Sequence, residues 1–247
     1  MIINFSPDIH IFIISWKGHH KNATFIANQL NDINDQVSIV YSDPDPKYNF
    51  KASCKLIKRS NDLFWGDKFK TCLDNCESEN MLIIHADCKY NDWINLVIKY
   101  DKAIKKIPNL GVWSPKINYA FFSTELTSLF TVSNPDYEVV CFIEGIVFGF
   151  SKIIQNRMRL VSYQDNKFGY WIDTLIACSA LSANKLLITD KSIQVQHPKN
   201  KGYSASDAQK QGEVFLNEQF SPSEKVLNKL IQSYINSNIL KKFNNVI

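Results

Sequence analysis

Unbroken apolar runs alternate with amphipathic segments in the first part of the chain. Residues 9–16 are almost all apolar and rich in β-branched side chains, which is typical of a strand buried on both faces. The apolar positions within residues 22–30 fit the spacing of a helix. Residues 37–41 form a second apolar run, which stops before Pro44 because a proline cannot continue a strand ladder. This order predicts a β-α-β unit.

Later segments continue the alternation. The pattern predicts helix-forming residues from Lys152, helices over 63–76, 93–107 and 174–183, and strands over 81–84, 111–117, 139–150 and 186–189. Alternating strands and helices indicate an α/β sandwich around a mainly parallel sheet. Ligands of such sheets bind beyond the carboxyl ends of the strands. No internal repeat or flexible linker interrupts the pattern, so we expect one main domain over residues 1–220.

The segment 221–247 has a different pattern. From residue 223, apolar residues recur at helical spacing with lysines elsewhere on the surface: Leu227, Ile231, Ile235, Ile239 and Phe243. We therefore predict an amphipathic C-terminal helix. Two interpretations of it are open, namely packing on the main domain or contact with an anionic membrane surface.

Composition narrows the class of protein. The 247 residues carry 28 basic and 24 acidic side chains, a formal net charge of +4, which disfavours a protein that coats nucleic acid. No apolar run approaches the roughly 18 to 20 residues of a membrane span. No secretory signal precedes the first apolar run, so we predict a cytoplasmic protein. The six cysteines include no Cys-x-x-Cys pair, which indicates free thiols.

The most informative fragment for chemistry is His85-Ala86-Asp87, which directly follows the predicted strand 81–84. A carboxylate at the carboxyl end of a buried strand can meet a divalent cation whose other ligands are phosphate oxygens. Asp87 is therefore a candidate metal ligand. The alternatives are that Asp87 caps the helix that begins near Asn91 or lies in a solvated turn.

Three fragments together resemble GT-A-fold glycosyltransferases, in particular bacterial family 2-like enzymes. The His85-Ala86-Asp87 fragment resembles their Asp-x-Asp region, with a histidine at the first acidic position. Gly169 and Asp173 are similar to their Gly-x-x-x-Asp element, and residues 188–198 are similar to their closing strand, which ends in His-Pro. The resemblance spans residues 9–217. It implies a GT-A, Rossmann-like three-layer α/β/α sandwich.

The resemblance also implies catalytic and metal-binding roles. Asp87 and His197 would position Mn²⁺ or Mg²⁺ on the donor diphosphate. Asp173 would be the general base of an inverting transfer, since the start of a helix keeps a carboxylate ionised. Glu144, the only carboxylate on an apolar segment, would bind the acceptor. A second assignment for Glu144 is the general base. The structural alternatives are a helix cap for Asp173, a core histidine for His197 and a hydrogen-bonded carboxylate for Glu144.

Substrate-binding residues follow from the same resemblance, with a nucleotide-sugar half at about 1–118 and an acceptor half at about 119–220. Trp171 joins Glu144 as an acceptor contact. For the lysines, the alternative is a solvated basic surface. The expected donor-binding residues are Ser15, Trp16, Asp43, Lys68, His85, Lys199, Lys201 and Tyr203.

The implied function is a metal-dependent, inverting glycosyltransferase that moves a sugar from a nucleotide-sugar to a glycan or lipid-linked acceptor. The usual setting is bacterial surface polysaccharide or lipopolysaccharide assembly, at the inner face of the membrane if the C-terminal helix contacts lipid. One alternative is a sugar nucleotidyltransferase, although residues 16–20 lack the Gly-rich, basic loop that holds a nucleoside triphosphate. The other is a catalytically degenerate GT-A module that binds a glycan, which His85 in place of an acidic residue suggests.

Overall fold

The structure, a computed structural model, describes residues 8–42, 48–60, 64–198 and 203–244. Within these residues, nine strands form one sheet in the order β3-β2-β1-β4-β8-β5-β9-β7-β6. The strands are β1 (Ile9–Ser15), β2 (Val37–Ser42), β3 (Lys55–Arg59), β4 (Asn80–His85), β5 (Leu110–Asn118), β6 (Ser128–Thr131), β7 (Tyr137–Val140), β8 (Val147–Ser151) and β9 (Leu186–Gln196).

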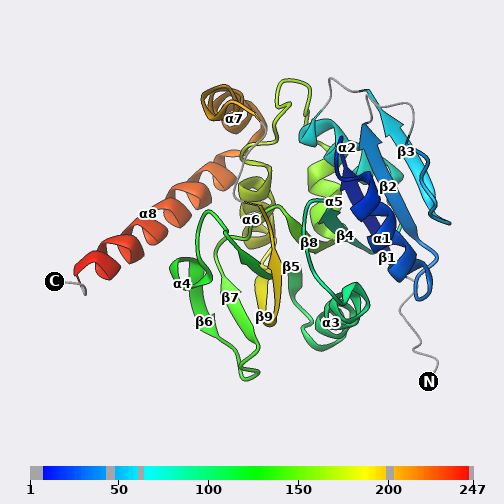
Figure 1. Cartoon of the computed structure of the whole chain (residues 1–247). Helices are drawn as coiled ribbons and strands as arrows, with labels where there is room; N and C mark the ends of the chain where they lie inside the picture. Colours follow the sequence, from blue (N-terminus) through cyan, green and yellow to red (C-terminus); the bar gives the residue numbers. More distant parts are fainter. Residues whose placement is uncertain (1–7, 43–47, 61–63, 199–202, 245–247) are drawn as a thin grey trace.

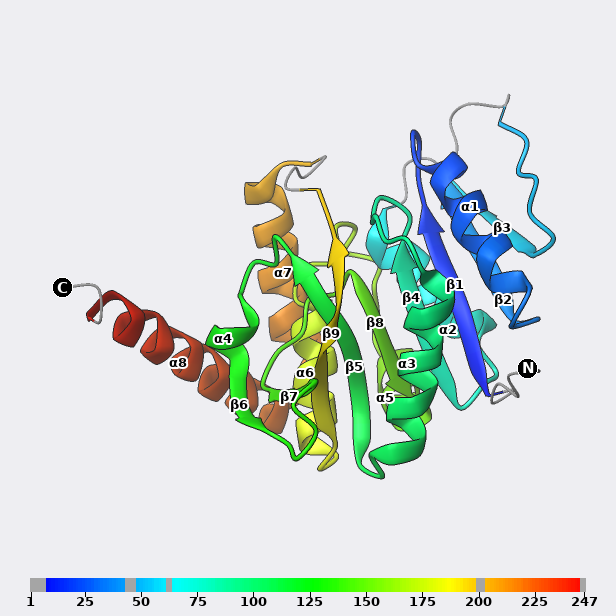
Figure 2. The same cartoon turned by 60° about the horizontal axis from the view of Figure 1, so that its bottom comes forward.

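Helices cover both faces of the sheet, which confirms the three-layer α/β/α sandwich (Figures 1 and 2). α1 and α3 lie on one face, and α2, α5 and α6 lie on the other. The helices are α1 (His20–Asn31), α2 (Trp65–Asn75), α3 (Trp93–Lys106), α4 (Thr124–Thr127), α5 (Lys152–Arg159), α6 (Ile172–Ser182), α7 (Ala205–Gln219) and α8 (Pro222–Asn244).

The central strand β1 shows why an unbroken apolar run folds this way. Ile11 and Ile13 are fully buried in the core that includes α1 and α3. Phe12 and Ile14 are fully buried in the core on the opposite face, beneath α2 and α5. Successive side chains of a strand point to opposite faces, so both cores draw apolar surface from one segment. Burial of each such side chain contributes roughly 1.5–3 kcal/mol.

The predicted α/β sheet is present, and it is mixed rather than purely parallel. β3, β2, β1 and β4 are parallel to one another, and β5 is parallel to β9. Between these two groups lies β8, which runs antiparallel to both β4 and β5. β7 and β6 add an antiparallel pair at the far edge.

The apolar run predicted as one strand over 139–150 is divided. β7 ends at Val140 and β8 begins at Val147, and residues 141–146 form the connection between them. Inside β8, Gly149 lies so close to Tyr100 that an added Cβ would come within 2.2 Å of the tyrosine ring. A side chain at this position would therefore displace α3 from the sheet.

The predicted C-terminal helix is present as α8 and packs on the domain. Ile231 and Ile235 are buried in the core shared with α6. Arg157 binds both carboxylate oxygens of Glu224 at 2.7 and 2.9 Å, and the Ser179 hydroxyl donates to the same carboxylate at 2.9 Å. This partly buried ion pair, with two hydrogen bonds between the side chains, fixes the start of α8 against α5 and α6.

Two further features concern the cysteines and the helices. All six cysteines lie in the described residues as free thiols. No helix in the described ranges is long and apolar enough to cross a bilayer.

Candidate functional site

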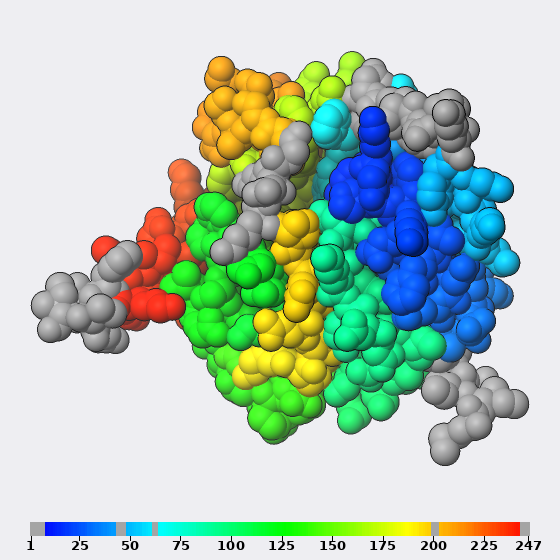
Figure 3. Space-filling model, in the orientation of Figure 1, coloured from blue at the N-terminus to red at the C-terminus, as the bar shows by residue number. Residues whose placement is uncertain are grey.

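One edge of the sheet gathers the candidate residues. The parallel strands β1, β4, β5 and β9 all end at this edge, and β8 begins there because it runs in the opposite direction. The backbone N–H of His85, at the end of β4, donates to the carbonyl of Ile146, just before β8, at 3.1 Å. Glu144 and Gly145 therefore lie beside the His85–Asp87 turn. On the face in Figure 3 the two halves of the chain stand side by side, blue to teal against green to yellow.

Hydrogen bonds to its backbone groups hold the turn that carries Asp87. The N–H of Ala86 donates to the carbonyl of Ile14 at 2.9 Å. The side-chain amide of Asn22 donates to the carbonyls of Ala86 and Cys88 at 2.7 and 2.8 Å. The interpretation of Asp87 as a helix cap is wrong, because Asp92 caps α3 by accepting from the N–H of Asn95 at 2.9 Å.

Asp87 and His197 form a pair. Lys89 and Gln196 exchange two backbone hydrogen bonds of 2.8 and 3.0 Å, and this bridge brings the end of β9 to the turn after β4. His197 Nε2 lies 3.3 Å from Asp87 Oδ2. Burial raises the pKa of the Asp87 carboxyl, but the hydrogen bond from His197 and the neighbouring imidazoles outweigh burial, so its pKa is lowered overall.

The Asp87 carboxylate is incompletely satisfied. Its Oδ1 is buried and has no hydrogen-bond partner among the described residues. Ligand atoms of His85, Asp87 and His197 lie within 4.8 Å of one another. A buried carboxylate oxygen without a partner is costly, and a divalent cation would satisfy it. The carboxylate, completed by phosphate oxygens, suits Mn²⁺ or Mg²⁺, and an imidazole nitrogen in the donor set favours Mn²⁺ of the two, because Mg²⁺ prefers oxygen ligands.

His85 is enclosed by indole rings. The Trp16 and Trp65 rings lie 5.7 and 5.8 Å from its ring, both edge-on. The Trp65 indole N–H donates a hydrogen bond to His85 Nε2. Burial lowers the pKa of His85 to about 4, and the nearby Asp87 carboxylate only partly opposes this. His85 is therefore neutral at physiological pH.

The remaining donor-side predictions fall in different surroundings. Ser15 is buried at the end of β1, where its hydroxyl lies 2.8 Å from His20 Nδ1. Lys68 is only 3% exposed on α2, so the alternative that it lies on a solvated surface is wrong. Burial lowers the pKa of Lys68 to about 8, and its charge contributes to the lowered pKa of His85. Asp43, Lys199 and Lys201 lie outside the described residues.

Asp173 lies in the first turn of α6. Trp171 adopts the left-handed conformation (φ 68°) immediately before the helix, and the N–H of Thr174 donates to Asp173 Oδ1 at 2.8 Å. Burial raises the pKa of Asp173 to about 7, the charge of Glu144 adds to this rise, and backbone hydrogen bonds from Thr174 and Gly145 oppose it. A carboxyl with this pKa can exchange a proton near neutral pH.

Glu144 and Gly145 lie next to Asp173. An added Cβ on Gly145 would come 3.3 Å from the Cβ of Asp173, so a small residue allows this close approach. Glu144 Oε1 accepts from the backbone N–H of Phe122 at 3.1 Å. The two carboxylates therefore face one region from the start of α6 and from the segment before β8.

Tyr203 and Trp171 complete this side. The Tyr203 ring stacks on Phe168 at 5.0 Å, and burial raises its pKa to about 12, with contributions from Tyr170 and Asp173. The indole of Trp171 packs against Gly212 of α7, where an added Cβ would come 2.4 Å from the ring. Trp171 thus packs against α7, and its role as an acceptor contact stays a prediction.

The residue that sequence reasoning missed is Trp65. Its ring stacks on Phe69 at 5.0 Å and also contacts His85. On the other side it covers Gly169, where an added Cβ would come 2.4 Å from the ring. The N–H of Gly66 also donates to the carbonyl of Lys167 at 3.2 Å. Trp65 therefore connects the His85–Asp87 edge with the segment that leads into Asp173.

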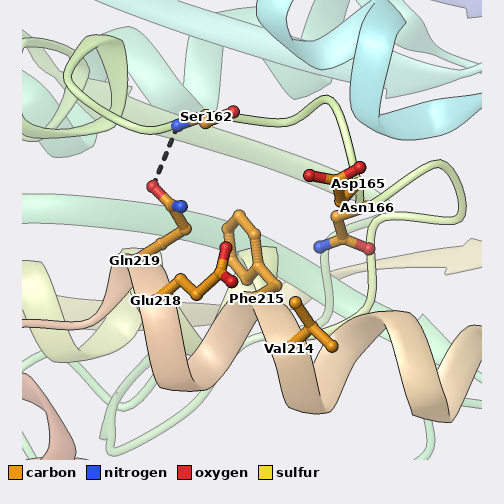
Figure 4. Close-up of a pocket in the computed structure, with 7 residues that line it drawn as sticks. All are labelled: Ser162, Asp165, Asn166, Val214, Phe215, Glu218 and Gln219. Carbon is orange, nitrogen blue, oxygen red and sulfur yellow. Dashed lines mark hydrogen bonds between the residues drawn. The ribbon is translucent and has the colours of Figure 1, made fainter.

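A small pocket between residues 162–166 and α7 lies apart from these residues (Figure 4). Its free volume is about 10 Å³, which is at the lower limit for a single water molecule. It is a packing gap rather than a substrate site. Its lining residues are Ser162, Asp165, Asn166, Val214, Phe215, Glu218 and Gln219.

Comparison with known proteins gives fold-level similarity. No protein-family model and no curated protein sequence matches the chain. Among solved structures, GalNAc-T7 with UDP, GalNAc and Mn²⁺ superposes with a TM-score of 0.56 at 9% identity, over 85% of this chain and 49% of that one. This chain thus spans about half the length of GalNAc-T7.

Two other solved structures match more of their own length. The mannosyltransferase PcManGT from Pyrobaculum calidifontis, in complex with GDP-Man and Mn²⁺, gives a TM-score of 0.55 at 12% identity, over 97% of this chain and 77% of that one. Glucosyl-3-phosphoglycerate synthase from Mycobacterium tuberculosis, with Mg²⁺ and UDP, gives a TM-score of 0.56 at 10% identity, over 85% of this chain and 78% of that one. Together with the mixed sheet and its two helical layers, these similarities show that the chain has the GT-A fold.

Proposed function

We propose that the protein is a metal-dependent, inverting glycosyltransferase that moves a sugar from a nucleotide-sugar to an acceptor hydroxyl. The observation that carries the proposal is the pairing, at one sheet edge, of a cation-type site with a base-type carboxyl. Asp87 offers a buried, unpartnered oxygen beside His197. Asp173 has a pKa near neutrality beside Glu144. The similar folds of enzymes solved with UDP or GDP-Man and Mn²⁺ or Mg²⁺ support this assignment.

On the donor side, Asp87 and His197 would hold the cation. Bound Mn²⁺ or Mg²⁺ would neutralise the negative charge that develops on the leaving nucleoside diphosphate. Trp16 and the buried Lys68 lie close enough to His85 to line the same region. The proposal also includes donor binding by Ser15 and Tyr203, and by Asp43, Lys199 and Lys201, which lie outside the described residues.

On the acceptor side, Asp173 removes the proton from the acceptor hydroxyl as its oxygen bonds to the anomeric carbon. The bond from that carbon to the diphosphate oxygen breaks on the opposite face, so the configuration inverts. The negative charge of Glu144 keeps the Asp173 carboxylate basic. Glu144 also has a carboxylate oxygen bonded to the Phe122 N–H, which orients it beside the acceptor.

The setting we propose is assembly of a bacterial surface glycan, including lipopolysaccharide, on the cytoplasmic side, with a glycan or lipid-linked acceptor. The outer face of α8 supports contact with a membrane surface. Val226, Leu230 and Leu240 are 56, 60 and 64% exposed. Lys229 and Lys241 flank them, and residues 225–242 contain no acidic side chain. Apolar side chains flanked by lysines favour an anionic lipid surface.

A thermal-shift screen of UDP-, GDP-, CDP- and dTDP-sugars with Mn²⁺ tests the catalytic proposal. We expect one nucleotide class to stabilise the protein, and to do so only with the cation. Asp87→Asn and His197→Ala should remove this stabilisation, whereas Asp92→Asn, at the cap of α3, should keep it. Stabilisation that persists without a divalent cation, or in Asp87→Asn, would count against the cation site.

A further inference from the structure

An exposed aromatic segment follows β5 at the sheet edge that carries the candidate site. Tyr119, directly after β5, is 55% exposed, and Phe121 is 76% exposed. Their neighbours are anchored in different cores. Ala120 packs against the core that includes α1 and α3, and Phe122 packs against the core beneath α2 and α5. The segment therefore crosses the sheet edge between the two cores, and Phe121 is presented to solvent there.

The start of this segment lies next to the cation side of the site. Asn118, the last residue of β5, is in register with Gln196 of β9, which directly precedes His197. Tyr119 then adopts the left-handed conformation at φ 66°. A bulky side chain is uncommon in this conformation, and such strained residues cluster at ligand-binding sites. Glycine would adopt it without steric cost, so the tyrosine indicates a role for its side chain.

The end of the segment lies next to the proposed base. The Phe122 N–H donates to Glu144 Oε1 at 3.1 Å. The next residue, Gly145, is so close to Asp173 that an added Cβ would come 3.3 Å from the aspartate Cβ. Phe121 therefore borders the region that the two carboxylates face, where an acceptor hydroxyl would lose its proton.

The charge of this part of the chain is negative. Residues 117–150 contain no lysine, arginine or histidine. Their four charged residues are Glu125, Asp136, Glu138 and Glu144. Two of these carboxylates are paired with lysines of β5 and β9, at 3.5 and 2.8 Å. A phosphate group on the acceptor would meet like charges here, whereas neutral hydroxyl groups would not.

We propose that Tyr119 and Phe121 form a platform on which a sugar ring of a neutral glycan acceptor packs, and that they select this class of acceptor. The inference rests on the proposed function for the reaction. A sugar ring has a face of C–H groups and a rim of hydroxyls. The negative face of an aromatic ring attracts the C–H groups, and an ionised carboxylate such as Glu144 accepts hydrogen bonds from the hydroxyls. A hydrocarbon chain would offer the carboxylate no donor.

Saturation-transfer difference NMR on the full-length protein tests the platform without a donor substrate. The probes are methyl glycosides of glucose, galactose, mannose and N-acetylglucosamine, with glucose 6-phosphate as the charged counterpart. We expect the ring C–H protons of at least one neutral glycoside to receive saturation, and those of glucose 6-phosphate to receive less. Phe121→Ala should abolish the transfer, and Phe121→Trp should keep it.

Phe25→Ala is the matched control for this experiment, because it removes an exposed phenylalanine from α1. It should leave the saturation transfer unchanged. The proposal would be overturned by absence of transfer to every neutral glycoside, by stronger transfer to glucose 6-phosphate, or by transfer that persists in Phe121→Ala.

Steady-state kinetics with a neutral acceptor test the role in the reaction. Phe121→Ala should raise the acceptor KM about tenfold and change kcat by less than about threefold, because the platform binds the acceptor equally before and during transfer. Tyr119→Gly should also raise the acceptor KM. Because glycine relieves the left-handed backbone, this variant should melt at the wild-type temperature or above it. A lowered melting temperature with an unchanged KM would show that Tyr119 is only structural.

The two experiments separate this inference from the proposed function. If nucleotide-sugar and Mn²⁺ bind but transfer occurs only to a phosphate-bearing acceptor, the proposed function stands and the platform is refuted. If neutral glycosides bind through Phe121 but no nucleotide binds, the platform stands as a glycan-binding surface and the proposed function fails. If neither neutral glycosides nor nucleotides bind, both are refuted.

Discussion

Asp87 and Asp173 lie at the same sheet edge in opposite electrical surroundings. Asp87 is surrounded by imidazoles, which outweigh burial and lower its pKa. Asp173 is partly buried beside Glu144, and desolvation together with the charge of Glu144 raises its pKa to about 7. One carboxylate is therefore a permanent anion suited to a cation, and the other can take up a proton. Two carboxyls with pKa values driven apart are the usual sign of divided roles in catalysis.

The largest effect should come from removing the base. Asp173→Asn should lower turnover by about a hundredfold to ten-thousandfold, because an amide cannot accept the acceptor proton. Binding of the nucleoside diphosphate with Mn²⁺ should stay within about twofold of wild type, since Asp173 is not among the residues proposed to hold the cation or the diphosphate. An assay of the glycosylated product measures turnover, and isothermal titration calorimetry measures nucleotide binding. Turnover within tenfold of wild type would remove Asp173 from this role.

The complementary change is Asp87→Asn. It should weaken Mn²⁺ binding by about a hundredfold, because a neutral amide replaces the carboxylate that faces the cation. Electron paramagnetic resonance of free Mn²⁺ gives the affinity directly. Asp92→Asn is the matched control, because Asp92 is exposed and bonded to the N–H of Asn95. Equal Mn²⁺ affinities in the two variants would contradict the assignment of Asp87.

The pH dependence of turnover should report the base. Below the raised pKa of Asp173, about 7, turnover should fall about tenfold per pH unit, and above it turnover should be level. Glu144→Gln removes a like charge and should move the midpoint of the profile to lower pH. Steady-state kinetics from pH 5 to 9 would show both effects. A midpoint that does not move would mean that Glu144 does not act on Asp173.

Stability should change in opposite directions at the two carboxyls. The folded-state pKa of Asp173 lies above its unfolded value, so its contribution to stability is present at low pH and is lost as pH rises through about 7. Asp173→Asn should therefore raise the melting temperature at pH 8, by about 2–4 °C for each 1 kcal/mol. The lowered pKa of Asp87 gives the reverse sign, so Asp87→Asn should lower the melting temperature. Differential scanning calorimetry at pH 8 without metal measures the melting temperatures of both variants.

A local pattern singled out Asp87, whereas Asp173 was singled out by its resemblance to the Gly-x-x-x-Asp element of GT-A glycosyltransferases. Asp87 follows a short apolar strand, and Asp173 opens a helix, so each is marked by its immediate neighbours. Their surroundings could not be predicted in the same way. The groups that shift their pKa values, His197 and Glu144, are brought in by β9 and by the segment before β8. Such contacts depend on strand order, which periodicity does not encode.

The direction of the strands could not be predicted from the sequence either. An apolar run of a few residues predicts a strand, and β8 was found in this way, but its antiparallel direction was not. β3 and α7 were missed because β3 is mostly exposed and α7 is polar over most of its length. Trp65 was missed because its partner His85 lies 20 residues away. The signal that could have suggested a contact was Gly169, a glycine four residues before Asp173.

The reversed strand β8 has a consequence for how the chain acquires its structure. β4 and β5 lie within residues 80–118, but the strand that joins them comes from residues 147–151. Until β8 is inserted, β4 and β5 each present an open edge of unpaired N–H and C=O groups, which invites pairing between chains. Residues 9–118 thus gain a closed sheet only after residues 147–151 have been synthesised. A fragment that ends at Asn118 should aggregate rather than fold as a separate nucleotide-binding unit.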